Sequence, residues 1–271
     1  MDTRQRTRRL ILAALAALGL ALPLALVGAT APATAIVGGS QASDGQHPFM
    51  VSLQTAGSRG SDGHFCGGSV VGKRWILTAA HCTIFEPGDV QAVVGRTDLT
   101  AGGGQVLRIA RMEVHPDYAD TGSSDVALWR TTKKIKAPRI ALPTAADDAL
   151  EAPGSTLTVA GWGHEVYQAG SVQDRLKTLD VRVTSDLECV TNTLVLGFAE
   201  ATEFCAAELG GDSCQGDSGG PIFGTRADGR VVQLGAVSYG LGCALPLFPG
   251  VYAELNSPTI LSWIRATMRA A

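Results

Sequence analysis

The sequence has 271 residues, of which 45% are hydrophobic and 17% are charged, and its formal net charge at pH 7 is -3. These proportions exclude a disordered or coiled-coil chain and predict a globular protein with a substantial core. The acidic balance, without a basic block or an aromatic stripe between basic residues, argues against nucleic acid as a partner. The 33 glycines are spread along the chain and favour many short strands joined by tight turns.

The first 35 residues have the order of an export signal. Four arginines precede an apolar run from Leu10 to about Val27, and a stretch of small residues ends at Ala35. The run approaches the ~18 residues that a membrane-spanning helix needs, but Pro23 and the Ala, Thr and Pro residues after it favour cleavage. We therefore expect a signal peptide over residues 1–35, with or without a short propeptide, and a secreted, extracellular product without a stable membrane anchor.

From Ile36 onward there is no low-complexity linker and no repeat, so we expect one compact unit over residues 36–271. Short apolar runs separated by Gly, Pro, Asn or Asp predict strands. In the first run Phe49, Val51 and Leu53 alternate with their neighbours, which is the period of a half-exposed strand. The expected strands cover residues 49–54, 75–78, 90–94, 106–109, 126–129, 157–160, 179–183 and 231–239.

Only the C-terminal tail clearly predicts a helix. Ser257 can cap it, Pro258 suits its first position, and apolar residues follow at helical spacing. Those residues are Ile260, Leu261, Ile264 and Met268. An all-β chain with this pattern can form two β-barrels or a β-sandwich.

The cysteines form an even set in a chain with an export signal, which predicts three disulfide bonds. Spacing alone does not select their pairing. A zinc site is a poor alternative because the sequence has no C-x-x-C pair. The cysteines are Cys66, Cys82, Cys189, Cys205, Cys214 and Cys243.

The segment G-D-S-G-G-P, which begins at Gly216, places Ser218 among glycines, where a tight turn can expose its hydroxyl. A hydroxyl is a poor nucleophile at neutral pH, so it needs a base, usually His, and donors for the developing oxyanion. The nucleophile elbow of α/β-hydrolases has a similar string but requires a later His, and none follows Ser218. A subtilisin order using Asp44 or Asp62 with His81 lacks the α/β pattern of that fold.

The order His, Asp, Ser remains, with His81 in T-A-A-H-C and Asp125 in S-D-V-A-L. Together with I-V-G-G from Ile36, G-W-G over 161–163 and P-G-V-Y over 249–252, these segments resemble the trypsin-like serine proteases of the chymotrypsin fold. The resemblance spans nearly all of residues 36–271 and is close to the short secreted bacterial trypsins. It implies two packed antiparallel six-stranded β-barrels, roughly 36–150 and 151–271, with a C-terminal helix.

By the same resemblance, Ser218 attacks the scissile carbonyl, His81 transfers the proton, and Asp125 orients the imidazole and stabilises its charged form. The backbone N–H groups of Gly216 and Ser218 form the oxyanion hole. This chemistry needs no cofactor or metal. The intact residues argue against the alternative function, a catalytically inactive homologue that serves as a binding or adhesion module.

The resemblance also places Asp212 at the floor of the primary pocket, where a buried carboxylate favours a substrate with Arg or Lys before the cut. Expected partners are such proteins or peptides and protein protease inhibitors, and the expected state is a monomer. An edge of the strand that ends at Tyr239 would pair with extended substrate. Tyr239 stands where many relatives have Trp. The other expected substrate-binding residues are Ser213, Ser238, Gly240 and Gly250.

Activation is implied to depend on a new N-terminal amine at Ile36 that pairs with Asp217. Ala35 rather than Arg or Lys precedes Ile36, which argues against self-activation by a tryptic cut. The A-T-A sequence over 33–35 fits a signal-peptidase site. The alternative is a signal cut near Ala29 followed by removal of a propeptide by another protease.

The family pattern implies that Cys66 pairs with Cys82, Cys189 with Cys205, and Cys214 with Cys243. Calcium binding stays open, because residues 95–105 contain no pair of Glu ligands like that of the vertebrate enzymes. The remaining histidines are expected to be surface or packing residues. They are His47, His64, His115 and His164.

Overall fold

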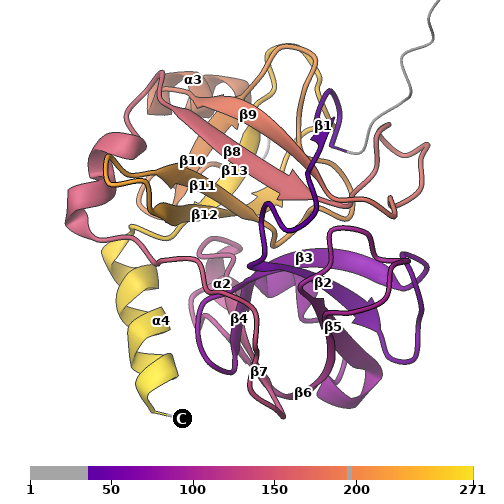
Figure 1. Cartoon of the computed structure of the whole chain (residues 1–271). Coiled ribbons are helices and arrows are strands. Elements are labelled where there is room, and N and C mark those ends of the chain that lie inside the picture. The colour runs from indigo at the N-terminus through magenta and orange to yellow at the C-terminus, as the bar shows by residue number, and fades with distance from the viewer. Residues whose placement is uncertain (1–35, 194–196, 271) are drawn as a thin grey trace, which may run out of the picture. The chain divides into compact units, whose positions relative to one another are not determined.

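A computed structural model of the chain describes residues 36–193 and 197–270 (Figure 1). The expected export segment, residues 1–35, lies outside the described residues. Strands predominate in the rest and form two antiparallel sheets, each of which closes on itself. No helix in the described ranges is long and apolar enough to cross a membrane.

The first sheet is a six-stranded barrel in which β2 pairs with both β3 and β5 and so closes the ring. Its interior holds apolar side chains that alternate along the strands, including Val51, Leu53, Ile76 and Trp129. The strands are β2 (Met50–Thr55), β3 (His64–Val70), β4 (Trp75–Thr78), β5 (Val90–Val94), β6 (Gln105–Val114) and β7 (Ala127–Thr131).

The second sheet also closes, because β8 pairs with both β9 and β11. A short strand, β1 (Ser40–Gln41), adds to one end of β9. The expected fold, two six-stranded barrels with a C-terminal helix, is confirmed. The strands of the second ring are β8 (Thr156–Gly161), β9 (Lys177–Val183), β10 (Glu203–Ala207), β11 (Pro221–Thr225), β12 (Val231–Tyr239) and β13 (Gly250–Glu254).

Helices are short except at the C-terminus. The expected tail helix is α4 (Pro258–Arg269), preceded by Ser257, whose hydroxyl lies 3.0 Å from that of Thr259 and does not cap the backbone. The helix follows the second barrel in sequence but lies beside the first (Figure 1). The ring of Trp263 packs there against the ring of His115. The other helical segments are α2 (Tyr118–Thr121), α3 (Asp186–Thr193), η1 (Ala80–Cys82), η2 (Pro87–Asp89) and η3 (Ala145–Leu150).

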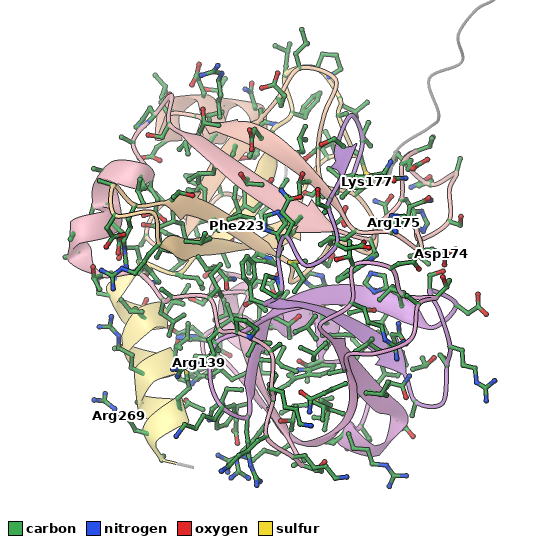
Figure 2. The ribbon with its side chains drawn as sticks, viewed as in Figure 1. Arg139, Asp174, Arg175, Lys177, Phe223 and Arg269 are labelled. Carbon is green, nitrogen blue, oxygen red and sulfur yellow. A yellow bond between two sulfur atoms is a disulfide. The ribbon has the colours of Figure 1, made fainter. Side chains whose placement is uncertain are left out.

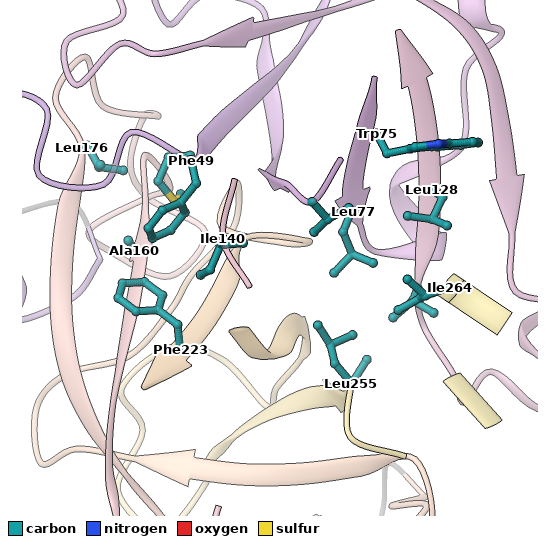
Figure 3. Packing of buried hydrophobic residues seen from close by; sticks show 14 of the residues in the cluster. Phe49, Trp75, Leu77, Leu128, Ile140, Ala160, Leu176, Phe223, Leu255 and Ile264 are labelled. Carbon is teal, nitrogen blue, oxygen red and sulfur yellow. The ribbon is translucent and has the colours of Figure 1, made fainter. Parts of the chain in front are cut away.

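An apolar layer joins the two barrels (Figure 3). Phe49 from the first barrel meets Phe223 from the second edge to face, with ring centroids 5.4 Å apart. Such aromatic pairs contribute about 0.5–1.5 kcal/mol beyond the area they bury. Polar contacts add to the junction near Asp174 and Arg175 (Figure 2), where Ser61 donates to Asp174 at 2.6 Å.

The first expected strand differs from its prediction in one respect. β2 is buried on both faces rather than half-exposed, with Ser52 and Gln54 as inaccessible as their apolar neighbours. These polar side chains are tolerated because the Gln54 amide donates to Ser52, and Ser52 in turn contacts the ring of His64. The alternating pattern therefore separates an apolar buried face, which carries Val51 and Leu53, from a polar buried face, which carries Ser52 and Gln54.

Candidate active site

Strand pairing brings His81 and Asp125 together. Thr78 at the end of β4 faces Ala127 at the start of β7, so the residues just beyond both strands lie at the same end of the barrel. The His81 Nδ1 atom lies 2.7 Å from Asp125 Oδ2, and the His81 backbone N–H donates to Oδ1 at 2.9 Å. Because a carboxylate only accepts, Nδ1 carries the proton and Nε2 keeps its lone pair.

Asp125 is buried, with 5% of its side chain exposed, whereas the His81 side chain is 32% exposed. Burial acts to raise the pKa of Asp125, but hydrogen bonds from His81 and Ser238 outweigh it and hold that pKa below its ordinary value. The Ser238 hydroxyl donates to Oδ2 at 2.6 Å. Asp125 is therefore an ionised, oriented acceptor beside the imidazole.

Ser218 lies on a tight turn of the second barrel that packs against the first. Gly67 of β3 donates its N–H to the Ser218 carbonyl at 2.8 Å, and Cys82, next to His81, has its sulfur 3.6 Å from the same oxygen. Gly219 has φ +75°, and a Cβ there would lie 2.1 Å from the Thr78 hydroxyl. Glycine thus allows the turn to approach the strand that leads to His81.

The expected disulfide pairs are all present, and two of them brace this region. Cys66–Cys82 ties β3 to the 3-10 turn that carries His81. Cys214–Cys243 joins two segments that flank a cavity. Cys66, His81 and Cys82 lie close together, but the two sulfurs are bonded to each other and offer no thiolate to a metal. The third pair is Cys189–Cys205.

That cavity has a volume of about 180 Å³ and extends from Ser218 to Asp212. Its wall includes Ser213, Ser238, Tyr239, Gly240 and Gly250, so all the expected substrate-binding residues border it. Asp212 is 6% exposed, and none of the ion pairs formed within the described ranges includes it. Burial raises the pKa of its carboxyl to about 6, although hydrogen bonds from Ala244 and Ser213 act in the opposite direction.

Comparison with known proteins shows the family to which a chain with this fold and these site residues belongs. A family model described as Trypsin matches residues 36–264. The chain belongs to the trypsin family. A trypsin from Saccharopolyspora erythraea is 37% identical over 229 residues, which cover 82% of this chain and 94% of that protein. Trypsin alpha from Drosophila melanogaster is 33% identical over 234 residues, covering 86% of this chain and 87% of that protein. The chain is accordingly a trypsin-like serine endopeptidase.

His64 contacts this trypsin-family site, although the sequence predicts only a surface or packing residue at that position. Its side chain is buried, and its Nε2 lies 2.8 Å from the carbonyl oxygen of Gly216, one of the two expected oxyanion-hole residues. Its Nδ1 lies 2.7 Å from the Ser52 hydroxyl. Because a carbonyl only accepts, Nε2 carries the proton and Ser52 donates to Nδ1. Burial lowers the pKa of His64 to about 4, which keeps the ring neutral.

Replacing His64 with alanine is expected to lower kcat roughly tenfold with little change in KM. The variant would free the carbonyl of Gly216, which has φ +95°, but would keep its N–H, and outright loss of an oxyanion donor costs about 10²–10³ in kcat. Steady-state kinetics on a peptide substrate test this, with Ser52→Ala as a milder variant that disturbs the same ring. A rise in KM at constant kcat would assign His64 to substrate binding instead.

Asp217 and Ile36 are both fully buried. The Asp217 carboxylate accepts N–H bonds from Gly163 at 2.8 Å and Cys214 at 2.9 Å, and burial raises its pKa to about 7. A Cβ on Gly163 would lie 2.5 Å from the Asp217 carboxyl carbon, so glycine is required there. Ile36 belongs to the apolar core of the second barrel, and the carbonyl of the next residue, Val37, accepts from the Asp212 N–H.

Proposed function

We propose that this trypsin-family protein is exported and hydrolyses peptide bonds after Arg or Lys, using Ser218, His81 and Asp125. The observation that carries the proposal is the buried Asp212 carboxylate in the wall of a cavity that Ser218 also borders. A carboxylate without a cation in such a place is stabilised when a long basic side chain enters. A larger groove of about 390 Å³ also borders Asp212, but Ser218 is not among its lining residues.

In the proposed reaction, Ser218 Oγ forms a bond to the scissile carbonyl carbon while its proton passes to His81 Nε2. The imidazolium then gives that proton to the amide nitrogen as the C–N bond breaks, which releases the amine product and leaves an ester on Ser218. A water molecule repeats both steps, so that the acid is released and the proton returns to Ser218. The contacts of His81 with Asp125 support this role, because they orient Nε2 as the accepting atom.

The negative charge of the tetrahedral intermediate would be held by the N–H groups of Gly216 and Ser218. The peptide bond between Gly216 and Asp217 is held on both sides, by the His64 contact with the Gly216 carbonyl and by the hydrogen bonds of the Asp217 carboxylate. Two donors that are fixed before the reaction need no reorganisation as charge develops.

A fluorescent organophosphorus reagent tests the nucleophile and separates an active protease from an inactive homologue. We expect stoichiometric labelling of the mature wild-type protein and none of the Ser218→Ala variant. A peptide library should then give cuts after Arg and Lys. Equal labelling of both proteins would contradict the assignment of Ser218, and cuts after other residues would contradict that of Asp212.

Binding of a cationic pocket ligand is expected to weaken at acidic pH. Because burial raises the pKa of Asp212 to about 6, the carboxyl is mostly protonated below that pH in the empty pocket, and an amidinium must displace the proton. Affinity for a small aryl amidine should therefore be constant above about pH 7 and fall roughly tenfold per unit well below pH 6. Calorimetry across this range measures the effect, and an equal pH dependence in Asp212→Asn would refute its cause.

For activation, we propose that cleavage before Ile36 creates an ammonium that pairs with Asp217. Both residues are buried, and an unpaired buried carboxylate is strongly disfavoured. The A-T-A sequence over 33–35 makes signal peptidase the proposed source of the cut. N-terminal sequencing of protein exported by a strain that lacks other proteases should begin at Ile36, and a start upstream would favour a separate processing protease.

A further inference from the structure

We propose that Glu203 is a positioning residue that fixes the ring of Tyr239. This pair determines how well the protease accepts the substrate residues that precede the Arg or Lys, which would lie in a cleft along the open edge of β12. The inference rests on the proposed function, since it concerns the binding of the same substrate beside Ser218. It assigns a role to a buried carboxylate that the reaction itself does not use.

Tyr239 ends β12 at the side of the cleft. Beyond Val237, no strand among the described residues pairs with the side of β12 that faces the Ser218 turn, so this edge is open to extended substrate. A register shift between Val237 and Tyr239 marks a bulge in the pairing with β13. Ser238 there donates to Asp125, while Tyr239 borders the cavity that contains Ser218 and keeps part of its ring exposed.

Glu203, the first residue of β10, lies behind that ring and is 3% exposed. Its Oε2 accepts a hydrogen bond from the Tyr239 hydroxyl at 2.9 Å and another from the Ala199 N–H at 2.8 Å. None of the ion pairs found in residues 36–193 and 197–270 involves Glu203. Among the described residues, the Tyr239 hydroxyl is thus one of the two donors to this buried carboxyl group.

The contact is strongest when Glu203 is ionised. Burial raises the pKa of Glu203, and hydrogen bonds from Ala199 and Tyr239 act against that rise. A hydrogen bond to a charged acceptor is stronger than a neutral one. The ring of Tyr239 is therefore held by its hydroxyl as well as by packing, an attachment that phenylalanine at the same position would lack.

The same oxygen also connects the cleft wall to a neighbouring loop. Ala199 accepts from the N–H of Thr202, and Thr202 accepts from the N–H of Glu254 on β13, so the loop is attached to the sheet at several points. Through Glu203, the Tyr239 ring and this loop are fixed relative to each other. Substrate residues that lie along β12 upstream of the cut would meet a rigid wall, whereas a single-residue substrate would not reach it.

The test compares kcat/KM for an extended Arg-containing peptide with kcat/KM for a single-residue Arg ester. Each preparation is first titrated with an organophosphorus reagent, so that only active molecules are counted. We expect the extended-to-short ratio to fall roughly tenfold in Tyr239→Phe and in Glu203→Ala, as for loss of a hydrogen bond to a charged group. The double variant should lose no more than either single one, because both remove the same contact.

Two conservative variants complete the design. Glu203→Gln retains an oxygen that can accept from both Tyr239 and Ala199 but loses the charge, so its ratio should fall less than that of Glu203→Ala. Glu200→Gln removes an exposed carboxylate from the same loop and should leave the ratio unchanged. If Glu203→Ala does not fold, the extended-to-short ratios of Tyr239→Phe and Glu203→Gln provide the test.

The outcomes separate this inference from the proposed function. A wild-type protein that does not cut after Arg or Lys defeats the proposed function. A wild type that does so, with an unchanged ratio in Tyr239→Phe or additive losses in the double variant, overturns the role of Glu203 alone. A ratio in Glu203→Gln as low as in Glu203→Ala also overturns it, since an acceptor oxygen for the Tyr239 hydroxyl would then have no effect on the ratio.

Discussion

Replacing Asp212 with serine is expected to reduce kcat/KM for peptides cut after Arg or Lys by roughly 10⁴-fold, as for a site that loses the partner of a substrate's polar group. A guanidinium or ammonium in the variant would enter a buried cavity of about 180 Å³ without a countercharge. The loss should be shared between kcat and KM, because a basic side chain that is poorly held also misplaces the scissile bond.

The labelling rate with a small neutral organophosphorus reagent provides the internal control for Asp212→Ser. That reaction needs Ser218 and His81 but no basic side chain, so its rate should change little. Glu208→Ser, which removes an exposed carboxylate from the same segment, should retain full activity on Arg peptides. Unchanged tryptic activity in Asp212→Ser would show that the specificity pocket lies elsewhere.

Replacing Asp125 with asparagine should lower kcat by about 10⁴, which is the loss that this substitution causes in chymotrypsin-fold proteases. The carboxylate accepts from both the backbone N–H and Nδ1 of His81. An amide group presents an N–H to one of these positions, and the ring then favours the tautomer with its proton on Nε2. That nitrogen can no longer accept the proton of Ser218.

KM should change little in Asp125→Asn, because the side chain is buried behind His81 and does not border the cavity. Kinetics with an amide and an ester of the same Arg peptide would separate formation of the ester on Ser218 from its hydrolysis. We expect the rates of both steps to be reduced. Circular dichroism should show an unchanged fold. A kcat within tenfold of the wild type would mean that Asp125 does not set the protonation of the base.

Local sequence predicted the strands whose apolar runs are continuous, such as β4 and β5, at the bounds found in the structure. It did not predict β1, β3, β10, β11 or β13, which are very short or contain Gly, Pro or Glu. In β3, Gly67 allows the backbone of the second barrel to approach, since a Cβ there would lie 3.0 Å from Gly220. Tertiary contact rather than strand propensity determines the composition of such strands.

His81 contacts Asp125, and one cavity borders both Ser218 and Asp212, although these residues lie far apart in the sequence. The family resemblance, rather than any local pattern, indicated them as candidates. His64 and Glu203 were not predicted as site residues, since their roles depend on contacts with residues far along the chain. His64 contacts Gly216, and Glu203 contacts Tyr239. A buried histidine or glutamate has no local pattern that distinguishes packing from function. The one signal in the sequence was that each lies two residues before a cysteine, in H-F-C and E-F-C.

The origin of the site in two separately closed sheets has a consequence for how activity responds to stress. His81 and Asp125 belong to one ring and Ser218 to the other, and the apolar layer around Phe49 and Phe223 joins the two rings. A slip of that layer by a fraction of an ångström would misalign nucleophile and base while every strand kept its partners. The turnover rate should therefore decline under mild denaturant before any spectroscopic measure of β-structure does. Activity is then the more sensitive measure of how the two barrels are aligned.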